Sequence, residues 1–400
     1  MKSTTPKPLI RLFGIPLIEH KIRKLKGCDI AVVYHDKKLA EYLQKKFPKV
    51  ELIFNPYPEK ENGYSLYCAK GFIKEGETFV LLMADHYYGD AFYQEIGKTK
   101  KGNYLFVSPY CYDPLEATKV QTQNHHIIKI GKELREYDYF DTGFFILSWE
   151  IFKYIEKILD IPKITLSRVM QLVADDKKLY YKEIKDIWID IDTKEDLKLA
   201  ENLIRKSLIK ESDGFISKLI NRKISTRITP LLARFDAVTP NKITVFTTLL
   251  GIIAGTLFLS KNVLLAGILT QISSILDGCD GELARIKNLS SKFGAVLDTV
   301  LDRYVDTFII FSIYLSLDRT TIVSGLFFLC ITGTILVSYI SHLTKIRPYF
   351  ITRDIRLFLI MLFSIISPIY TASLEVLLAV IGTLSHLGVV YSLLKYKKQT

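Results

Sequence analysis

Acidic residues interrupt the apolar C-terminal half of the chain at spacings that could assemble a metal site. Asp277 and Asp280 lie three residues apart. Asp298 and Asp302 lie four apart, so each pair falls on one face of a helix, and Asp306 follows one turn later. Carboxylates at membrane depth are rare unless they are paired, bind ions or face water. Two facing helices could therefore bring four of these carboxylates to one point.

A cluster of four carboxylates requires cations, because the groups cannot all remain ionised in a small cavity. Two divalent ions would satisfy them. Such a pair can clamp a pyrophosphate and stabilise both the attacking and the leaving oxygen of an in-line displacement. The all-oxygen ligand set favours Mg²⁺ over Zn²⁺, with Mn²⁺ as an alternative.

A second set of acidic residues lies in the first half of the chain. Asp85 directly follows the apolar run 79–84, where a divalent ion bridging a nucleotide's phosphates could be held. A turn or a cap is the simpler interpretation of this residue. Asp192 or Thr193 could cap the next helix, which would leave Asp190 free.

The elements that would position these N-terminal residues alternate between short β-rich runs and amphipathic helices. This alternation predicts a Rossmann-like α/β domain with a doubly wound sheet, whose ligands bind beyond the carboxyl ends of the strands. The expected strands are 30–34, 50–54, 79–83, 104–108 and 144–148. The expected helices are 16–25, 38–47, 65–72 and 192–206.

The C-terminal half is instead a series of apolar stretches, which predicts an all-α membrane domain of about six transmembrane helices. Lys and Arg concentrate after the second and fourth stretches and at the C-terminus. The positive-inside tendency therefore predicts a multi-pass cell-membrane protein whose N-terminal domain and C-terminus are cytoplasmic. The stretches are approximately 243–259, 263–276, 293–317, 322–340, 357–370 and 374–394.

A basic segment, 215–234, joins the two halves and places apolar residues at helical spacing with cations between them. This pattern is typical of an amphipathic helix in a membrane interface, where its cations would meet anionic lipid. An ordinary surface helix packed on the preceding domain is the alternative. The expected organisation is an N-terminal domain 1–208, a juxtamembrane connector 209–238 and a transmembrane domain 239–400.

Length and composition limit the possible classes of protein. The chain has 400 residues, of which 49% are hydrophobic and 24% charged, which excludes a disordered or fibrous protein and favours two or three domains. The formal net charge of +12 is attributed to a bilayer surface rather than to a nucleic-acid partner, because cations flank the apolar stretches. The 5 cysteines are scattered without a CxxC spacing, so neither a disulfide framework nor a zinc site is expected.

The first 200 residues carry a series of short motifs that, in this order, resemble the sugar-phosphate nucleotidyltransferase family. The branch they resemble most is the inositol-1-phosphate cytidylyltransferases. The resemblance implies that Asp85 and Asp190 hold a metal and that Lys7 contacts phosphate. It also implies that Lys119 and Asp141 line the second-substrate pocket. The motifs are Lys7-Pro8-Leu9, Gly14-Ile-Pro16, Asn62-Gly63-Tyr64-Ser65, Asp85-His86, Glu116-Ala117-Thr118-Lys119, Asp141-Thr142-Gly143 and Trp188-Ile-Asp190-Ile-Asp192.

One feature of that family does not occur in this sequence. The family opens with a strand and a glycine-rich loop whose backbone N–H groups cradle a triphosphate, just before the stretch matched here by Thr5-Pro6-Lys7. Either Met1 is an internal methionine of a longer chain, or the loop has been lost. Efficient cytidylyl transfer is not expected from the sequence as written.

The aspartate pattern of the C-terminal half is similar to the signature of the CDP-alcohol phosphotransferase family. The resemblance covers the chain from about residue 215 onward. It implies that Asp277, Asp280 and Asp298 are metal ligands, and that Asp302 shares the second ion and takes the proton of the acceptor hydroxyl. The matched residues are Asp277, Asp280, Gly281, Ala284, Arg285, Gly294, Asp298 and Asp302.

The same resemblance implies a nucleotide site and a reaction. Asp277, Gly281, Ala284, Arg285 and Gly294 would contact cytidine diphosphate, because the small residues let the nucleotide approach the helix backbone. An acceptor hydroxyl attacks the β-phosphorus of a CDP-alcohol, and CMP leaves. The protein contributes positioning and charge neutralisation.

Four further cations indicate what the acceptor carries. Lys345, Arg347, Arg353 and Arg356 lie at the predicted cytoplasmic ends of the fourth and fifth apolar stretches. Guanidinium groups bind phosphate with fork geometry, so these residues favour a phosphorylated acceptor. Their alternative explanation is positive-inside topology alone.

Together the two halves resemble the bifunctional inositol-1-phosphate cytidylyltransferase and di-myo-inositol-phosphate phosphate synthase family. The resemblance implies that the substrates are CDP-inositol and inositol 1-phosphate, and that the protein is a homodimer. A phospholipid synthase that uses a CDP-activated lipid, with a degenerate N-terminal scaffold, is the alternative enzyme. An ion-coupled transporter is the non-enzymatic alternative, but it predicts polar residues spread along a path rather than gathered in one motif.

Overall fold

The computed structural model describes residues 5–399. Its internal contacts divide the chain into two compact units, Met1–Ile204 and Arg205–Thr400. Met1 lies outside the described residues, so the expectation about its place in a longer chain stays a prediction.

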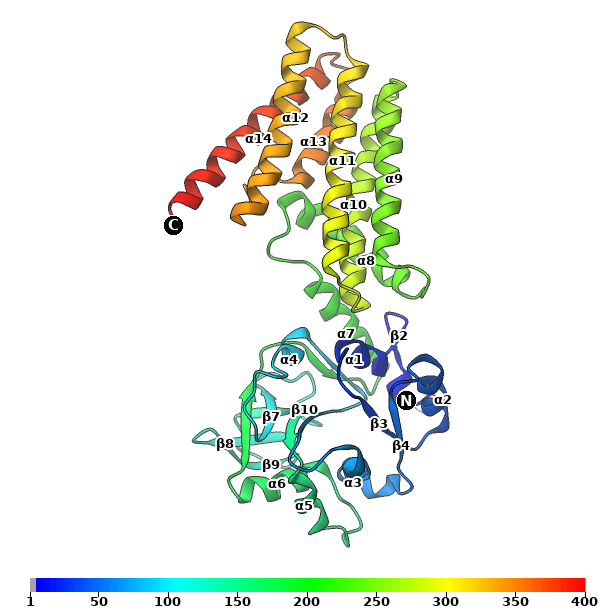
Figure 1. Cartoon of the computed structure of the whole chain (residues 1–400), viewed down its shortest axis with the longest axis vertical. Coiled ribbons are helices and arrows are strands. Elements are labelled where there is room, and N and C mark those ends of the chain that lie inside the picture. The colour runs from blue at the N-terminus through cyan, green and yellow to red at the C-terminus, as the bar shows by residue number, and fades with distance from the viewer. Residues whose placement is uncertain (1–4, 400) are drawn as a thin grey trace. The chain divides into compact units, whose positions relative to one another are not determined.

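The N-terminal unit is built on a six-stranded sheet of mixed direction (Figure 1). Strand β10 runs antiparallel to β5 and to β7, whereas β11 runs parallel to β7. The doubly wound arrangement expected from the sequence is therefore altered by antiparallel pairs. In order, the strands are β5 (Thr78–Leu82), β10 (Tyr139–Ser148), β7 (Asn103–Ser108), β11 (Leu179–Glu183), β9 (His126–Gly131) and β8 (Lys119–Gln123).

Three short strand pairs complete the described β structure of this unit. β1 (Arg11–Leu12) pairs with β2 (Ile15–Pro16), and β3 (Ala31–Tyr34) runs parallel to β4 (Glu51–Phe54). β6 (His86–Tyr88) pairs antiparallel with β12 (Trp188–Asp190). The helices are α1 (Leu17–Lys24), α2 (Lys37–Lys46), α3 (Glu61–Cys68), α4 (Asp90–Gln94), α5 (Ile151–Glu156), α6 (Leu166–Asp175) and α7 (Lys194–Ser207).

Strand β10 holds the core together because both of its faces are buried. Phe145 and Leu147 pack into one apolar cluster, whereas Phe144 and Ile146 pack into another. Successive side chains of a strand point to opposite faces, so this continuous apolar run belongs to a central strand. The strands and helices expected in this half are present, with ends that differ by a few residues.

The C-terminal unit is helical throughout its regular structure (Figure 1). A single π-helical turn, Ser217–Asn221, leads into α8. The following helices are α8 (Arg222–Ala233), α9 (Pro240–Leu259), α10 (Val263–Ile286), α11 (Lys292–Ser316), α12 (Thr321–Thr344), α13 (Arg353–Ile366) and α14 (Ser373–Lys397).

Four of these helices, α9, α10, α12 and α14, are long and apolar enough to cross a membrane. The expected count of about six crossings is not confirmed. Helix α13 has 14 residues, which span about 21 Å against the roughly 30 Å of a bilayer's hydrocarbon core. Helix α11 is long, but its first half carries the charges of the aspartate motif.

Helix α10 is at the centre of this packing, since it contacts α8, α9 and α13. Its approach to α13 depends on Gly267, where an added Cβ would lie 2.3 Å from the Cβ of Ser364. Small residues allow such close contacts between membrane helices. The helix that carries Asp277 and Asp280 is thus held from three sides.

Candidate active sites

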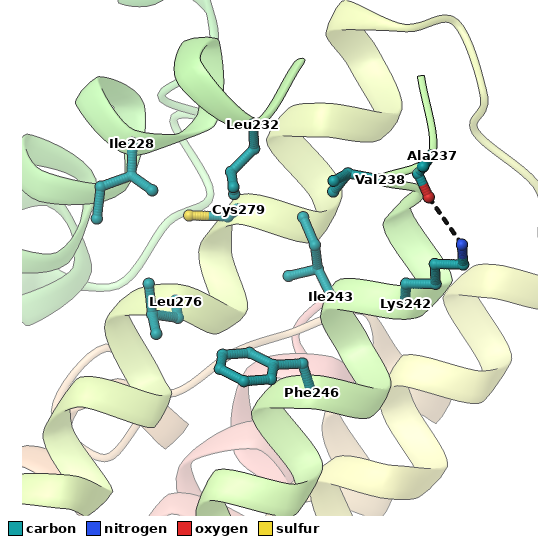
Figure 2. A pocket seen from close by; sticks show the side chains of 9 residues that line it. All are labelled: Ile228, Leu232, Ala237, Val238, Lys242, Ile243, Phe246, Leu276 and Cys279. Atoms are coloured by element: carbon teal, nitrogen blue, oxygen red, sulfur yellow. Dashed lines mark hydrogen bonds between the residues drawn. The ribbon is translucent and has the colours of Figure 1, made fainter. Parts of the chain in front are cut away.

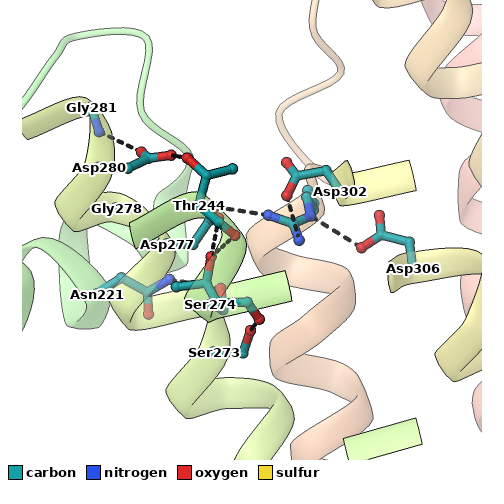
Figure 3. A network of polar contacts seen from close by, with 12 residues as sticks. Asn221, Thr244, Ser273, Ser274, Asp277, Gly278, Asp280, Gly281, Asp302 and Asp306 are labelled. Carbon is teal, nitrogen blue, oxygen red and sulfur yellow. Dashed lines mark hydrogen bonds and ion pairs between the residues drawn. The ribbon is translucent and has the colours of Figure 1, made fainter. Parts of the chain in front are cut away.

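Three aspartates of the motif meet between α10 and α11. One carboxylate oxygen from each of Asp277, Asp280 and Asp298 lies within 4.8 Å of the other two. Asp277 and Asp280 point to the same side of α10 (Figure 3). The sequence predicts this convergence, because each aspartate occupies the inward face of its helix.

Two threonines of α9 hold the α10 carboxylates in place. The Thr244 hydroxyl donates to Asp280 Oδ2 at 2.6 Å (Figure 3). The Thr247 hydroxyl lies 3.5 Å from Asp277 Oδ1. Sequence reasoning missed both threonines. The available signal was a pair of hydroxyl residues three apart, and so on one face, within an apolar segment.

The third carboxylate provides a test of whether the site suits a cation. Asp298 Oδ1 is buried and has no hydrogen-bond partner. An orphaned carboxylate oxygen is costly in a protein interior, whereas a divalent ion would satisfy it. The three residues therefore fit a divalent metal bound through oxygen.

Asp302 lies beside an arginine instead of within this group of three. Arg353 donates to Asp277 Oδ2 at 2.9 Å and lies 2.9 Å from Asp302 Oδ1. Its Nε donates to Asp306 Oδ1 at 3.0 Å. One guanidinium group thus bridges a carboxylate of α10 and two carboxylates of α11, and Figure 3 shows the labelled Asp277, Asp302 and Asp306 around it.

Asp306 has a larger role than sequence reasoning gave it. It is buried and also pairs with Arg356 at 3.2 Å and with Arg303 at 3.4 Å. Arg356 is itself buried. Asp306 thus fixes two of the four cations predicted to bind an acceptor phosphate.

The other two predicted acceptor cations, Lys345 and Arg347, are exposed in the connection between α12 and α13. Lys345 adopts a left-handed conformation with φ +59° at the end of α12. The structure thus brings Arg353 and Arg356 to the aspartates through Asp306. Lys345 and Arg347, which the structure also describes, form no ion pair with these aspartates.

The residues predicted to contact the nucleotide line the end of α10 and the start of α11. An added Cβ at Gly281 would lie 3.5 Å from Arg285 Nη1. Arg285 donates to the Leu208 carbonyl at 2.9 Å, and its buried Nε has no partner. At Gly294 an added Cβ would lie 3.0 Å from Asn241 Oδ1, so a larger residue there would have to displace that side chain. Ala284 is half-buried on α10.

A buried ion-pair network ties α10 to the connector. Glu282 is fully buried and accepts hydrogen bonds from Ser225 and Thr229 of α8, both at 2.6 Å. Arg222 donates to Glu282 at 2.8 Å and to the Gly278 carbonyl at 3.0 Å. Arg222 also pairs with Asp213 at 2.9 Å. These contacts clamp the turn of α10 that carries Asp280.

An apolar cavity of about 280 Å³ lies on another side of α10 (Figure 2). Its lining comes from α8, α9, the connection between them and α10, and among the described residues no carboxylate contributes to it. Lys242 lies at this cavity and donates to the Ala237 carbonyl at 2.8 Å. The aspartate site is therefore separate from the cavity.

In the N-terminal unit, Asp85, His86 and Asp190 form a second cluster, with one ligand atom of each within 4.8 Å of the others. His86 Nε2 lies 3.5 Å from Asp190 Oδ2 and 3.9 Å from Asp85 Oδ1. Burial lowers the pKa of His86, but the hydrogen bond and charge of Asp190 outweigh it and raise the pKa above its usual value.

Two lysines approach this cluster from different elements. Lys7 pairs with Asp192 and lies 3.9 Å from Asp85 Oδ2. Lys21 is buried on α1 and donates to the Ala84 carbonyl at 3.0 Å. Burial lowers the pKa of Lys21 to about 7, against the opposing charges of Asp85 and Asp190. Sequence reasoning missed Lys21, because its place on α1 gives no sign of a partner more than 60 residues away.

The predicted second-substrate residues lie on neighbouring strands. Lys119 of β8 faces Phe140 of β10, the residue before Asp141. The Lys119 ammonium donates to the Lys132 carbonyl at 2.9 Å. Asp141 accepts a hydrogen bond from the Gly143 N–H at 2.7 Å, yet burial raises its pKa to about 6.

Comparison with known proteins matches a part of each unit to a family model. Residues 237–390 match the CDP-alcohol phosphatidyltransferase family, and residues 1–108 match the MobA-like NTP transferase domain. A bifunctional IPC transferase and DIPP synthase from Aquifex aeolicus is 38% identical, over 99% of this chain and 95% of the relative. The chain belongs to this family of bifunctional proteins. It is a transferase with a CDP-alcohol phosphotransferase part and a nucleotidyltransferase part, families that generally use divalent metals.

Another full-length relative and two solved structures are also similar to this chain. The bifunctional IPC transferase and DIPP synthase of Thermococcus kodakarensis is 37% identical, over 97% of this chain and 92% of the relative. The inositol-1-phosphate CTP transferase structure from T. maritima has a TM-score of 0.45 and 24% identity, and covers 51% of this chain and 88% of that one. The Mycobacterium tuberculosis phosphatidylinositol phosphate synthase structure has a TM-score of 0.40 and 23% identity, with 44% and 94% covered.

Proposed function

We propose that the membrane unit transfers phosphoinositol from CDP-inositol to inositol 1-phosphate and releases CMP. One observation carries the proposal: the cluster of Asp277, Asp280 and Asp298 lies beside the guanidinium group of Arg353. The names of the full-length relatives, IPC transferase and DIPP synthase, support this choice of substrates.

In this proposal, Asp277, Asp280 and Asp298 would hold two Mg²⁺ ions, with Asp302 sharing the second, and the ions would supply charge neutralisation for the pyrophosphate of the donor. The acceptor hydroxyl attacks the β-phosphorus, the bond from that phosphorus to the CMP oxygen breaks, and Asp302 takes the hydroxyl proton. Arg353 contacts both Asp302 and Asp277, so a phosphate bound by Arg353 would lie beside the proton acceptor. Arg356 supports this site through Asp306.

The N-terminal unit, in the same proposal, makes CDP-inositol from CTP and inositol 1-phosphate with release of pyrophosphate, at the low rate expected from the sequence as written. Asp85 and Asp190 would hold its metal, Lys7 would contact the triphosphate, and Lys119 and Asp141 would contact the sugar phosphate. The MobA-like match over residues 1–108 and the convergence of Asp85 with Asp190 support this assignment.

The proposed setting is a cell membrane, with the N-terminal unit and the C-terminus in the cytoplasm and with two chains per assembly. The outer side of the connector supports membrane contact, because Ser225, Thr226 and Thr229 of α8 are buried while large apolar residues of the segment are exposed. Phe215, Leu231 and Phe235 are 65%, 53% and 63% exposed. Such a surface suits the interface of a bilayer. Cysteine labelling from either side of sealed vesicles and the mass of the detergent-solubilised particle test these two points.

The decisive experiment measures CMP release by the purified full chain in detergent with Mg²⁺ and inositol 1-phosphate. CDP-inositol and a CDP-activated lipid are compared as donors, with Asp302→Asn as the inactive variant and Asp318→Asn, an exposed loop position, as the matched control. Release from CDP-inositol that Asp302→Asn abolishes is expected. Release from the lipid donor alone would instead favour phospholipid synthesis.

A separate assay tests the N-terminal unit. CTP and inositol 1-phosphate are supplied to the same protein, and pyrophosphate is measured before any CDP-inositol is added. Asp85→Asn should abolish pyrophosphate release and leave CMP release from added CDP-inositol unchanged. Pyrophosphate release at the same rate in the variant would remove Asp85 from the proposed site.

A further inference from the structure

We infer that His86 is the third protein ligand, through Nε2, of the divalent-metal site formed by Asp85 and Asp190. The inference rests on the proposed nucleotidyl transfer of the N-terminal unit and deepens it. The resulting set of two carboxylates and one imidazole differs from the all-oxygen set of the membrane unit. Imidazole nitrogen suits transition metals, so this site should prefer an ion such as Mn²⁺ to Mg²⁺.

The hydrogen bonds at the other ring nitrogen determine the tautomer of His86. Nδ1 lies 3.0 Å from the Thr142 carbonyl oxygen, which can only accept. Nδ1 also lies 3.3 Å from the Tyr88 hydroxyl, whose own proton is donated to the Gly143 carbonyl at 2.9 Å. Both neighbours are acceptors, so Nδ1 carries the hydrogen, and the neutral ring presents a lone pair at Nε2.

That lone pair faces two carboxylates. Two anionic oxygens and a nitrogen lone pair repel one another unless a proton or a metal ion lies between them. Ligands about 2.1 Å from one ion, at tetrahedral to octahedral angles, lie about 3.0 to 3.5 Å apart. The Nε2 distances of 3.5 Å to Asp190 and 3.9 Å to Asp85 are close to this range. A ring whose second nitrogen donates to a backbone carbonyl is also the usual arrangement of metal-bound histidine.

The fold gives the ring a fixed position. His86 and Asp190 are directly opposite each other in the β6–β12 pair. The register between β10 and β7 shifts between Asp141 and Phe145, a bulge that includes Thr142 and Gly143. Gly143 has φ +73°, and an added Cβ would lie 3.0 Å from both Cε1 and Nδ1 of His86. The bulge therefore supplies both the carbonyl that orients the ring and the space that the ring occupies.

The test reads the metal–nitrogen contact directly. The full chain, without an affinity tag that contains histidine, carries Asp280→Asn and Asp298→Asn to weaken the membrane site, and Mn²⁺ is added without nucleotide. Pulsed electron paramagnetic resonance of bound Mn²⁺ should show a modulation from coordinated ¹⁴N. Labelling all histidines with ¹⁵N should replace this signal by the ¹⁵N pattern, and this arm requires no change at His86.

Two variants then assign the nitrogen. His86→Ala should remove the modulation and weaken Mn²⁺ binding at least roughly tenfold, since losing even a ligand's hydrogen-bond partner costs about 10- to 100-fold. His35→Ala, at an exposed position of the same unit, should change neither. A modulation that persists in His86→Ala would overturn the inference.

The remaining outcomes separate this inference from the proposed function. Bound Mn²⁺ without a nitrogen modulation would refute the role of His86 as a ligand and leave Asp85 and Asp190 as the metal site. His86 would then be a cationic partner of Asp190. An absence of Mn²⁺ binding in this background would contradict both the inference and the metal-dependent nucleotidyl transfer.

Discussion

Each of the two acidic clusters of this protein places several carboxylates close together. The two clusters balance this negative charge with different residues on different elements. The N-terminal cluster forms where short strands end, and a histidine lies between Asp85 and Asp190. The membrane cluster forms between long helices, and an arginine bridges its carboxylates. Arginine remains protonated under all ordinary conditions, whereas histidine and a buried lysine can lose their charge.

This difference follows from the surroundings of each cluster. In a membrane interior, water cannot compensate an acidic group, so a permanent cation or a metal ion must do so. In the N-terminal unit, Asp190 is exposed enough for water to contribute, with a side chain 47% exposed. The membrane cluster should therefore be far more sensitive to the loss of one charge than the N-terminal cluster is.

The strongest test of this contrast is the removal of the orphaned carboxylate. Asp298→Asn should lower the rate of CMP release about 10²- to 10³-fold, comparable to the loss of one essential electrostatic contact in other active sites. Pyrophosphate release by the N-terminal unit should not change, because Asp298 belongs to the other unit. Equal losses in both assays would indicate that the variant has unfolded.

The next test removes the anion that organises three guanidinium groups. Asp306→Asn should destabilise the membrane unit by about 3 kcal/mol, because it leaves buried arginines without their counter-charge. It should also raise the KM for inositol 1-phosphate, because Arg353 and Arg356 lose their common partner. Thermal unfolding followed by the helical circular dichroism signal measures the first effect, and Asp318→Asn is the control. A melting temperature equal to that of the unsubstituted protein would show that water can take the place of Asp306 beside the buried arginines.

The connector offers a smaller effect of the same kind. Glu282→Gln keeps the side-chain shape but removes the charge opposite Arg222, and should cost about 2 to 3 kcal/mol, the value of a hydrogen bond between charged groups. Asp213 still pairs with Arg222, so the loss is partial. Glu211→Gln, at an exposed position of the same segment, is the matched control. Equal melting temperatures for the two variants would show that the contact between Glu282 and Arg222 does not stabilise this unit.

Local sequence patterns predict much of this structure, because they depend on a single element. The spacing of Asp277 with Asp280, and of Asp298 with Asp302, follows from helix geometry alone. The alternation of Phe144 to Leu147 between two core clusters follows from the period of a strand. The resemblances to known families further predicted which of these elements assemble into each domain.

Contacts between distant elements could not be predicted in this way. The pairing of Arg353 with Asp302 depends on how α13 packs on α10 and α11, and the sequence indicated only a phosphate-binding role for Arg353. The roles of Thr244 and Glu282 depend on packing against α10 in the same way. The predicted count of membrane crossings is not confirmed. Hydropathy measures the length of an apolar stretch but does not show where a helix begins or ends, and α13 begins at Arg353 and has only 14 residues.

The smallest predicted effect concerns the pH dependence of the N-terminal unit. His20 is buried on α1, its Nε2 lies 3.2 Å from the Leu12 carbonyl, and burial lowers its pKa to about 4. The pKa of an unfolded histidine is about 6.5, so the unfolded state takes up a proton first as the pH falls. The stability that neutral His20 provides is therefore complete above pH 6.5 and is lost progressively down to about pH 4, with a loss of about 2 kcal/mol at pH 5.

Urea unfolding at pH 7 and pH 5 measures this loss. The 2 tryptophans of the chain, Trp149 and Trp188, both lie in the N-terminal unit, so their fluorescence follows that unit selectively. His20→Asn remains neutral at both pH values and should reduce the pH dependence by about 2 kcal/mol. His125→Asn, at an exposed position with φ +66° that asparagine tolerates, should leave it unchanged. If His20→Asn and His125→Asn gave the same pH dependence, other groups would account for the acid sensitivity of this unit.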